Sequence, residues 1–183
     1  MHTRRAIGLA TTMLSIALFA TACASDTSPT ITSRGITHSD FGVQNLEIAP
    51  LFSVETFDGG TFSLGDHLLN DGRPVFLNLW ASWCFPCRTE MPAIEAASRD
   101  HTDIKFVGVA IQDPSIDDAK DFADEVGATY TMGFDTDKSV DRIYRPFGIP
   151  ASYIISADGV ILERIFREVT EEALAEKFEE HFG

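Results

Sequence analysis

The stretch VFLNLWASWCFPCRTEMPAIEAA, residues 75–97, joins an apolar segment of strand length to a helical pattern through a Cys-x-x-Cys motif. Residues 75–80 predict a strand, and residues 84–99 predict a helix that Pro92 interrupts with a kink. A helix N-terminus presents unpaired N–H groups and a partial positive charge, and both favour a thiolate over a thiol. We therefore expect Cys84, at the start of this helix, to be a reactive thiol.

The second cysteine of the motif lies one turn further into the predicted helix. Cys87 should be more buried than Cys84, which gives it the resolving role: it attacks the mixed disulfide that Cys84 forms with a substrate. Pro86 suits the first helical turn, where no N–H donor is needed. The motif in this strand-to-helix setting is typical of thiol-disulfide chemistry.

Residues 1–22 have the pattern of an export signal. Arg4 and Arg5 precede an apolar segment, residues 7–22, that is too short and too rich in Ala and Thr to predict a membrane span. Small residues before Cys23 resemble a bacterial lipobox, with cleavage before Cys23 and a lipid on its sulfur, but they also fit an ordinary signal-peptidase site. The arginine pair weakly resembles a twin-arginine signal. We expect an extracytoplasmic protein, either anchored through Cys23 to the outer face of the cell membrane as a lipoprotein or secreted.

The cysteine count and the net charge reduce the number of functions that the sequence allows. With Cys23 assigned to the signal, only Cys84 and Cys87 remain in the folded part. A disulfide between these two cysteines closes a very short loop and stabilises the fold little, which favours a redox-active disulfide over a structural one. The formal net charge is −14, and removal of residues 1–22 leaves 12 Lys and Arg against 28 Asp and Glu, or −16. So acidic a chain is a poor partner for nucleic acid.

The body of the chain alternates strand and helix patterns. Residues 23–45, rich in Ser, Thr and Asp, are expected to form a flexible tether, and residues 46–183 one domain. Residues 52–64 predict a β-hairpin around an Asp-Gly-Gly turn. The other expected elements are helix 66–69, strand 75–80, helix 84–99, strand 104–111, helix 115–126, strand 130–134, helix 138–147, strands 152–156 and 160–166, and helix 170–182. This order predicts an α/β sandwich with a mixed sheet.

Three segments together resemble a known family. Residues 78–92 (NLWASWCFPCRTEMP), residues 49–60 and the loop at residues 147–152 (FGIPAS) are similar to the TlpA/ResA-like, or redoxin, branch of the thioredoxin superfamily. The resemblance implies a thioredoxin-like three-layer α/β/α sandwich with a mixed sheet, an N-terminal β-hairpin and a helical insertion. It also implies an extracytoplasmic thiol-disulfide oxidoreductase whose redox-active Cys84–Cys87 disulfide needs no added cofactor.

The resemblance also implies how a substrate is held. A cis peptide bond before Pro150 would place the backbone of Ile149 beside Cys84, in position to pair with an extended substrate chain. Trp83 is expected to shield the site and to contact the substrate.

A proton-exchanging carboxyl is the other implied feature. The resemblance places a partly buried glutamate at Glu90, where desolvation would raise its pKa and let it exchange protons with Cys87. The alternative is an ordinary solvated glutamate on the helix. Thioredoxins proper carry Asp where this chain has Asn78, and because Asn cannot titrate, Glu90 is the candidate for this role.

Several functions remain open from the sequence alone. The expected partners are exported proteins with cysteine pairs and a membrane redox partner. The pair could reduce such proteins, apocytochrome c among them, or act as an oxidase that forms their disulfides. Copper handling by a thioredoxin-like module is a further alternative. A thiol peroxidase is disfavoured because Ala81 occupies a position where peroxidases normally carry Thr, and a lone cysteine pair is a poor zinc site, so no metal is expected.

Overall fold

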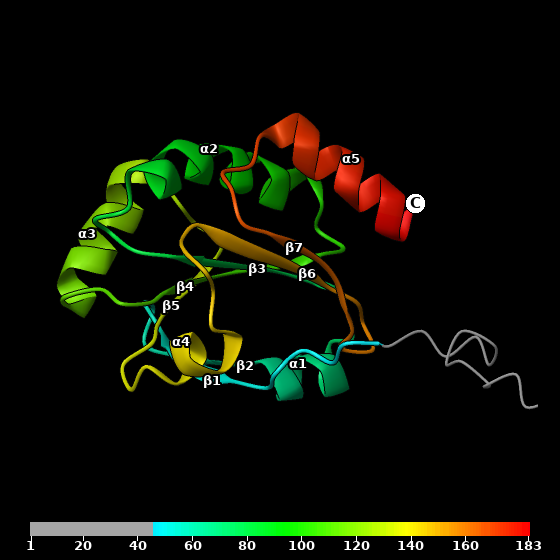
Figure 1. Ribbon diagram of the computed structural model, residues 1–183, viewed down its shortest axis with the longest axis horizontal. Coiled ribbons are helices and arrows are strands. Elements are labelled where there is room, and N and C mark those ends of the chain that lie inside the picture. The colour runs from blue at the N-terminus through cyan, green and yellow to red at the C-terminus, as the bar shows by residue number, and fades with distance from the viewer. Residues whose placement is uncertain (1–45) are drawn as a thin grey trace, which may run out of the picture. The chain divides into compact units, whose positions relative to one another are not determined.

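The computed structural model describes residues 46–183, whose helices and strands are drawn in Figure 1. The expected signal at residues 1–22, the expected tether at residues 23–45 and Cys23 lie outside the described residues, so these expectations stay predictions. Within the described part of the chain, no helix combines the length and the apolar character that crossing a membrane requires.

The elements follow the predicted order. They are β1 (Ser53–Thr56), β2 (Thr61–Ser63), α1 (Leu64–Asn70), β3 (Val75–Trp80), α2 (Phe85–Asp100), β4 (Lys105–Ala110), α3 (Ile116–Val126), β5 (Thr131–Phe134), α4 (Ser139–Tyr144), β6 (Ala151–Ile155), β7 (Ile161–Ile165) and α5 (Glu171–Phe182). β1 and β2 pair antiparallel, which confirms the predicted N-terminal hairpin.

One mixed sheet contains all seven strands, in the order β2-β1-β5-β4-β3-β6-β7. β3, β4 and β5 are parallel neighbours, and the remaining pairs are antiparallel. Helices α2, α3 and α5 cover one face of the sheet, and α1 and α4 lie on the other (Figure 1). The fold is therefore the expected three-layer sandwich, and the additional segment α3–β5–α4 between β4 and the closing hairpin contains the expected helical insertion.

Strand β3 occupies the centre of the sheet and leads directly into the Cys-x-x-Cys motif. All six of its residues are buried, because helices cover both faces. Asn78, in the middle of the strand, is aligned with Gly108 of β4 on one side and with Ser152 of β6 on the other. This alignment determines which side chains surround the base of the motif.

Helix α2 contains Pro92 in its interior. The helix continues from Phe85 to Asp100, so it does not end at the proline, and the predicted kink stays a prediction. Pro92 removes one N–H donor, but Met91 and Ile94 beside it are fully buried, and this packing holds the helix together on both sides of the proline.

Helix α4 ends earlier than predicted. The pattern indicated a helix to Phe147, whereas the helix ends at Tyr144 because Arg145 adopts a left-handed conformation with φ of 46°. Phe147 consequently lies in the following loop with its side chain almost fully exposed. By contrast, α3 agrees with the helix expected at residues 115–126: it begins after the Ser115 cap and ends at the left-handed Gly127.

Candidate active site

Cys84 and Cys87 form a disulfide at the N-terminus of α2. Cys84 is the N-cap of the helix, in an extended conformation, and its Sγ accepts a hydrogen bond from the backbone N–H of Cys87 at 3.2 Å. Cys84 retains 4% exposure and Cys87 has none. The predicted order of burial is confirmed, since Cys84 is the less buried of the two cysteines.

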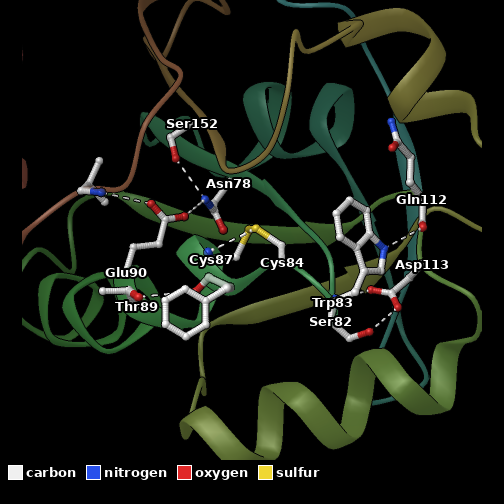
Figure 2. Close-up of a disulfide and its surroundings, with 12 residues drawn as sticks. Asn78, Ser82, Trp83, Cys84, Cys87, Thr89, Glu90, Gln112, Asp113 and Ser152 are labelled. Atoms are coloured by element: carbon white, nitrogen blue, oxygen red, sulfur yellow. Dashed lines mark hydrogen bonds between the residues drawn. A yellow bond between two sulfur atoms is a disulfide. The ribbon is translucent and has the colours of Figure 1, made fainter.

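The loop that delivers Cys84 is held by the segment that follows β4. The backbone N–H and the hydroxyl of Ser82 donate to the two carboxylate oxygens of Asp113, each at 2.6 Å. The indole N–H of Trp83 donates to the carbonyl oxygen of Gln112 at 3.1 Å (Figure 2). Sequence reasoning missed Asp113 and Gln112, because they lie 31 and 29 residues from their partners and belong to no motif.

Glu90 is buried beneath the disulfide. Only 1% of the residue is exposed, so the alternative of a solvated helix glutamate is wrong. Its Oε1 accepts from Asn78 Nδ2 at 2.7 Å, and its Oε2 accepts from the backbone N–H of Val169 at 3.1 Å. Burial raises the pKa of Glu90 to about 7, against the opposing effect of these two hydrogen bonds. The carboxyl can therefore gain or lose a proton near neutral pH.

Asn78 connects Glu90 to the neighbouring strand. Its Nδ2 also donates to the hydroxyl of Ser152 at 3.0 Å, and both residues are completely buried. Ser152 and Val169 also take part in the hydrogen bonds around Asn78 and Glu90, and neither was predicted from the sequence. Ser152 is adjacent to Asn78 through the β3–β6 register, and Val169 lies just before α5.

The loop before β6 lies on the same side of the molecule as the disulfide. The Ile149–Pro150 peptide bond is cis, as the resemblance implied. Ile149 packs against the buried cluster that contains both cysteines. A hollow of about 250 Å³ is lined by Trp83 and Ile149, together with Gln112, Pro146 and Gly148. The predicted substrate-binding residues Trp83 and Ile149 are thus brought together, although their role in binding stays a prediction.

Large apolar side chains are exposed around this hollow and the motif. Trp83 is 58% exposed, Phe85 is 77% exposed and Phe147 is 97% exposed. Arg88, which follows Cys87, forms an ion pair with Glu125 at 2.7 Å and stacks over the Phe122 ring. Its charge is therefore matched locally, and the surroundings of the disulfide are apolar instead of basic.

One cluster of metal-ligand residue types occurs in residues 46–183, far along the chain from the motif. Ligand atoms of Glu163, Glu180 and His181 lie within 4.8 Å of one another. The Lys177 ammonium contacts both carboxylates, at 3.0 and 3.3 Å. Because a bound cation would have to displace this lysine, we interpret the cluster as an ion-pair network.

The model of the AhpC/TSA family matches residues 46–164. The chain belongs to the AhpC/TSA family. Within that family it is similar to the thiol:disulfide interchange protein HelX of Rhodobacter capsulatus, with 33% identity over 72% of this chain and 73% of HelX. It is also similar to the thiol-disulfide oxidoreductase ResA of Bacillus anthracis, with 31% identity over 69% of this chain and 72% of ResA.

A solved structure supports the same assignment for this AhpC/TSA protein. The crystal structure of a thiol:disulfide interchange protein DsbE from Chlorobium tepidum, described as putative, superposes with a TM-score of 0.69 at 28% identity, covering 76% of this chain and 99% of that chain. The fold is thioredoxin-like, and the protein is a thiol-disulfide oxidoreductase of the TlpA/ResA branch, which confirms the family and the enzyme class that the motif implied.

Proposed function

We propose that Cys84–Cys87 is the working redox pair and that it reduces disulfides in exported proteins, the cysteine pair of apocytochrome c among them. The observation that supports this proposal most strongly is the combination of a disulfide in which Cys84 is the less buried cysteine with exposed apolar side chains around it. An extended, unfolded protein segment supplies apolar side chains for such a surface, and it can pair with the backbone of Ile149 before cis-Pro150. A small hydrophilic disulfide compound has neither the apolar side chains nor the extended backbone that would contact these two features.

The residues support a two-step exchange. The Cys84 thiolate attacks a substrate disulfide, which forms a Cys84–substrate disulfide and releases the first substrate sulfur as a thiolate. Cys87 Sγ then attacks Cys84 Sγ, which forms the Cys84–Cys87 disulfide, breaks the mixed disulfide and leaves the electron pair on the second substrate sulfur. Glu90 accepts the proton that Cys87 loses. Two electrons have then passed to the substrate, and a dithiol of a membrane redox partner restores the reduced pair.

The location proposed for this reaction rests on the sequence. Residues 1–22 direct export, a lipid on Cys23 anchors the protein to the outer face of the cell membrane, and residues 23–45 tether the domain at residues 46–183. Exported proteins pass within reach of a domain on such a tether.

Trapping the intermediate tests the proposal. In Cys87→Ser the resolving attack is removed, so exported proteins with cysteine pairs should accumulate as mixed disulfides on Cys84. The matched control, Cys84→Ser, should trap none and should abolish exchange. Non-reducing electrophoresis followed by mass spectrometry identifies the attached proteins. Equal exchange activity in the two variants would overturn the roles of the cysteines.

The reduction potential of the pair tests the direction of electron flow. A potential near that of thioredoxin, about −270 mV, supports a reductant, and one near about −120 mV shows an oxidase that forms disulfides. Equilibration of the full-length protein with dithiothreitol or glutathione buffers, followed by tryptophan fluorescence, measures it.

A further inference from the structure

The side-chain oxygen of Asn78 is a buried hydrogen-bond acceptor that nothing in residues 46–183 satisfies. The amide nitrogen of the same side chain donates twice, to Glu90 at 2.7 Å and to Ser152 at 3.0 Å. A buried acceptor without a donor costs about 1–3 kcal/mol, and native structures contain few of them. The unsatisfied Asn78 oxygen therefore indicates that a donor is missing from this state of the protein.

The orientation of the Asn78 amide follows from its partners. An ionised carboxylate can only accept hydrogen bonds, and Glu90 already receives the Val169 N–H on its other oxygen. While Glu90 is ionised, Asn78 must therefore present its nitrogen to it. In that state, exchanging the amide nitrogen and oxygen would place two acceptors next to each other, so the oxygen points away from Glu90.

The Asn78 oxygen points toward the disulfide, as Figure 2 shows. Side chains alternate along a strand, so Asn78 and Trp80 share one face of β3, and Trp80 belongs to the same buried cluster as both cysteines. On α2, Cys87 lies one turn before Glu90, the residue bonded to Asn78. Cys87 and Asn78 are both completely buried, so solvent reaches neither group.

We propose that Asn78 is a positioning residue whose side-chain oxygen accepts a hydrogen bond from the Cys87 thiol when the disulfide is reduced. In the disulfide neither sulfur carries a hydrogen, and the oxygen has no donor. Reduction breaks the S–S bond and adds two electrons and two protons, one to each sulfur, and the Cys84 proton can then leave to solvent. The Cys87 S–H is the donor that the oxygen lacks.

Two consequences follow for the redox pair. The hydrogen bond exists only in the dithiol form, so it stabilises the reduced state and raises the reduction potential. An acceptor beside Cys87 also favours its protonated form, which leaves the negative charge on Cys84 at the helix N-terminus. When Cys87 attacks the mixed disulfide, its proton moves to Glu90, the group bonded to the other end of the same amide.

This inference rests on the proposed redox use of Cys84–Cys87, but not on the substrate or the direction of electron flow. The test is the reduction potential of full-length Asn78→Leu at a pH above 7, where Glu90 is ionised in the wild type. Leucine has the same number and branching of side-chain heavy atoms as Asn but no acceptor, although it is larger. We expect the equilibrium with dithiothreitol to shift about tenfold toward the disulfide, which for this two-electron couple is about 30 mV.

Ser152→Ala is the matched control, because it removes one partner of the Asn78 nitrogen and leaves the oxygen in place. Its equilibrium should stay within about twofold of the wild type, since no group facing the disulfide changes. An unchanged potential in Asn78→Leu, or an equal shift in both variants, would overturn the inference. A pair that fails to equilibrate with dithiothreitol at all would instead overturn the proposed redox function.

An infrared measurement tests the same hydrogen bond with Asn78 intact. The difference spectrum between Cys84→Ala and the double variant Cys84→Ala/Cys87→Ala isolates the S–H stretching band of Cys87. We expect that band at the lowered frequency of a hydrogen-bonded thiol. A band at the frequency of a free thiol contradicts the inference even if Asn78→Leu fails to fold.

Discussion

At the scale of single residues, Glu90 combines burial with a titration near neutral pH. Its carboxyl is fully enclosed, and its two hydrogen-bond donors, from Asn78 and Val169, only partly replace the water it has lost. The resulting pKa of about 7 makes the residue able to exchange a proton without a large free-energy change at physiological pH. Residues with such pKa values are often functional, and this one lies one helical turn from Cys87.

Glu90→Gln should change the pH dependence of exchange. In the wild type, the rate at which Cys87 resolves a mixed disulfide should rise as the pH increases through about 7, because only the ionised carboxyl accepts the Cys87 proton. The variant should lose this rise and should be slower by roughly 10- to 100-fold at about pH 8. Stopped-flow fluorescence from about pH 5 to about pH 9 measures both profiles, and superimposable profiles would remove Glu90 from the proton transfer.

The stability of the same variant provides an independent measurement. The Glu90 pKa is about 7 in the folded protein against 4.5 for the unfolded reference, so the folded state holds more protons between these values and its stability falls as pH rises. This cost is absent below about pH 4.5 and reaches about 3 kcal/mol above pH 7. The free energy of unfolding of Glu90→Gln relative to wild type should therefore increase by about 3 kcal/mol between about pH 4 and about pH 8. A difference independent of pH would contradict the raised pKa.

At the scale of elements, local sequence determines where helices and strands lie better than it determines the contacts between one element and another. The strand at residues 75–80 and the helix at residues 115–126 depend on neighbouring residues, and both were predicted correctly. Asn78 was noted only for being unable to titrate. Its bond to Ser152 spans 74 residues and depends on the pairing of β3 with β6, which no local pattern encodes.

The burial of Glu90 is a second feature that local sequence does not determine. Its burial was implied by a family resemblance, whereas its spacing from Cys87 alone fits an exposed residue equally well. The donor from Val169 lies 79 residues away, in the segment before α5. The cysteine roles could thus be inferred from a strand followed by a helix, while the polar environment of Glu90 required three elements to be in place.

Gly108 on β4 tests how closely the side chains of the neighbouring strands pack over the sheet. An added Cβ would lie 2.7 Å from Met132 Sδ and 3.1 Å from atoms of Trp80 and Tyr130. Gly108→Ala should therefore destabilise the domain by about 1–3 kcal/mol, since these side chains are confined in the core and must move. Urea unfolding monitored by circular dichroism measures the change.

Gly148→Ala is the control for this substitution. Nothing lies within 4 Å of an added Cβ at Gly148, and its backbone does not require glycine. We expect its stability to stay within about 0.5 kcal/mol of the wild type. Equal stabilities for the two variants would show that the packing around Gly108 is looser than these distances imply.

At the scale of the whole molecule, the redox disulfide belongs to a strongly acidic domain. Residues 46–183 contain 26 Asp and Glu against 11 Lys and Arg, a formal net charge of −15. Arg88, the basic residue next to the motif, is paired with Glu125 and adds no unmatched positive charge there. The summed field should therefore attract cationic reactants to the Cys84 sulfur and repel anionic ones.

Small disulfides of different charge test this field without depending on the natural substrate. The reduced protein should react faster with cystamine, which is dicationic, than with oxidised glutathione, which is anionic, and the ratio of the two rates should fall about tenfold as ionic strength rises from about 0.01 M to about 1 M. The neutral hydroxyethyl disulfide is the matched control, and its rate should be nearly independent of salt. Intrinsic differences among the leaving thiols change the ratio by a constant factor, so only the electrostatic part depends on salt. The same salt dependence for all three disulfides would show that the acidic surface does not reach the Cys84 sulfur, and that the charge of a substrate plays no part in its selection.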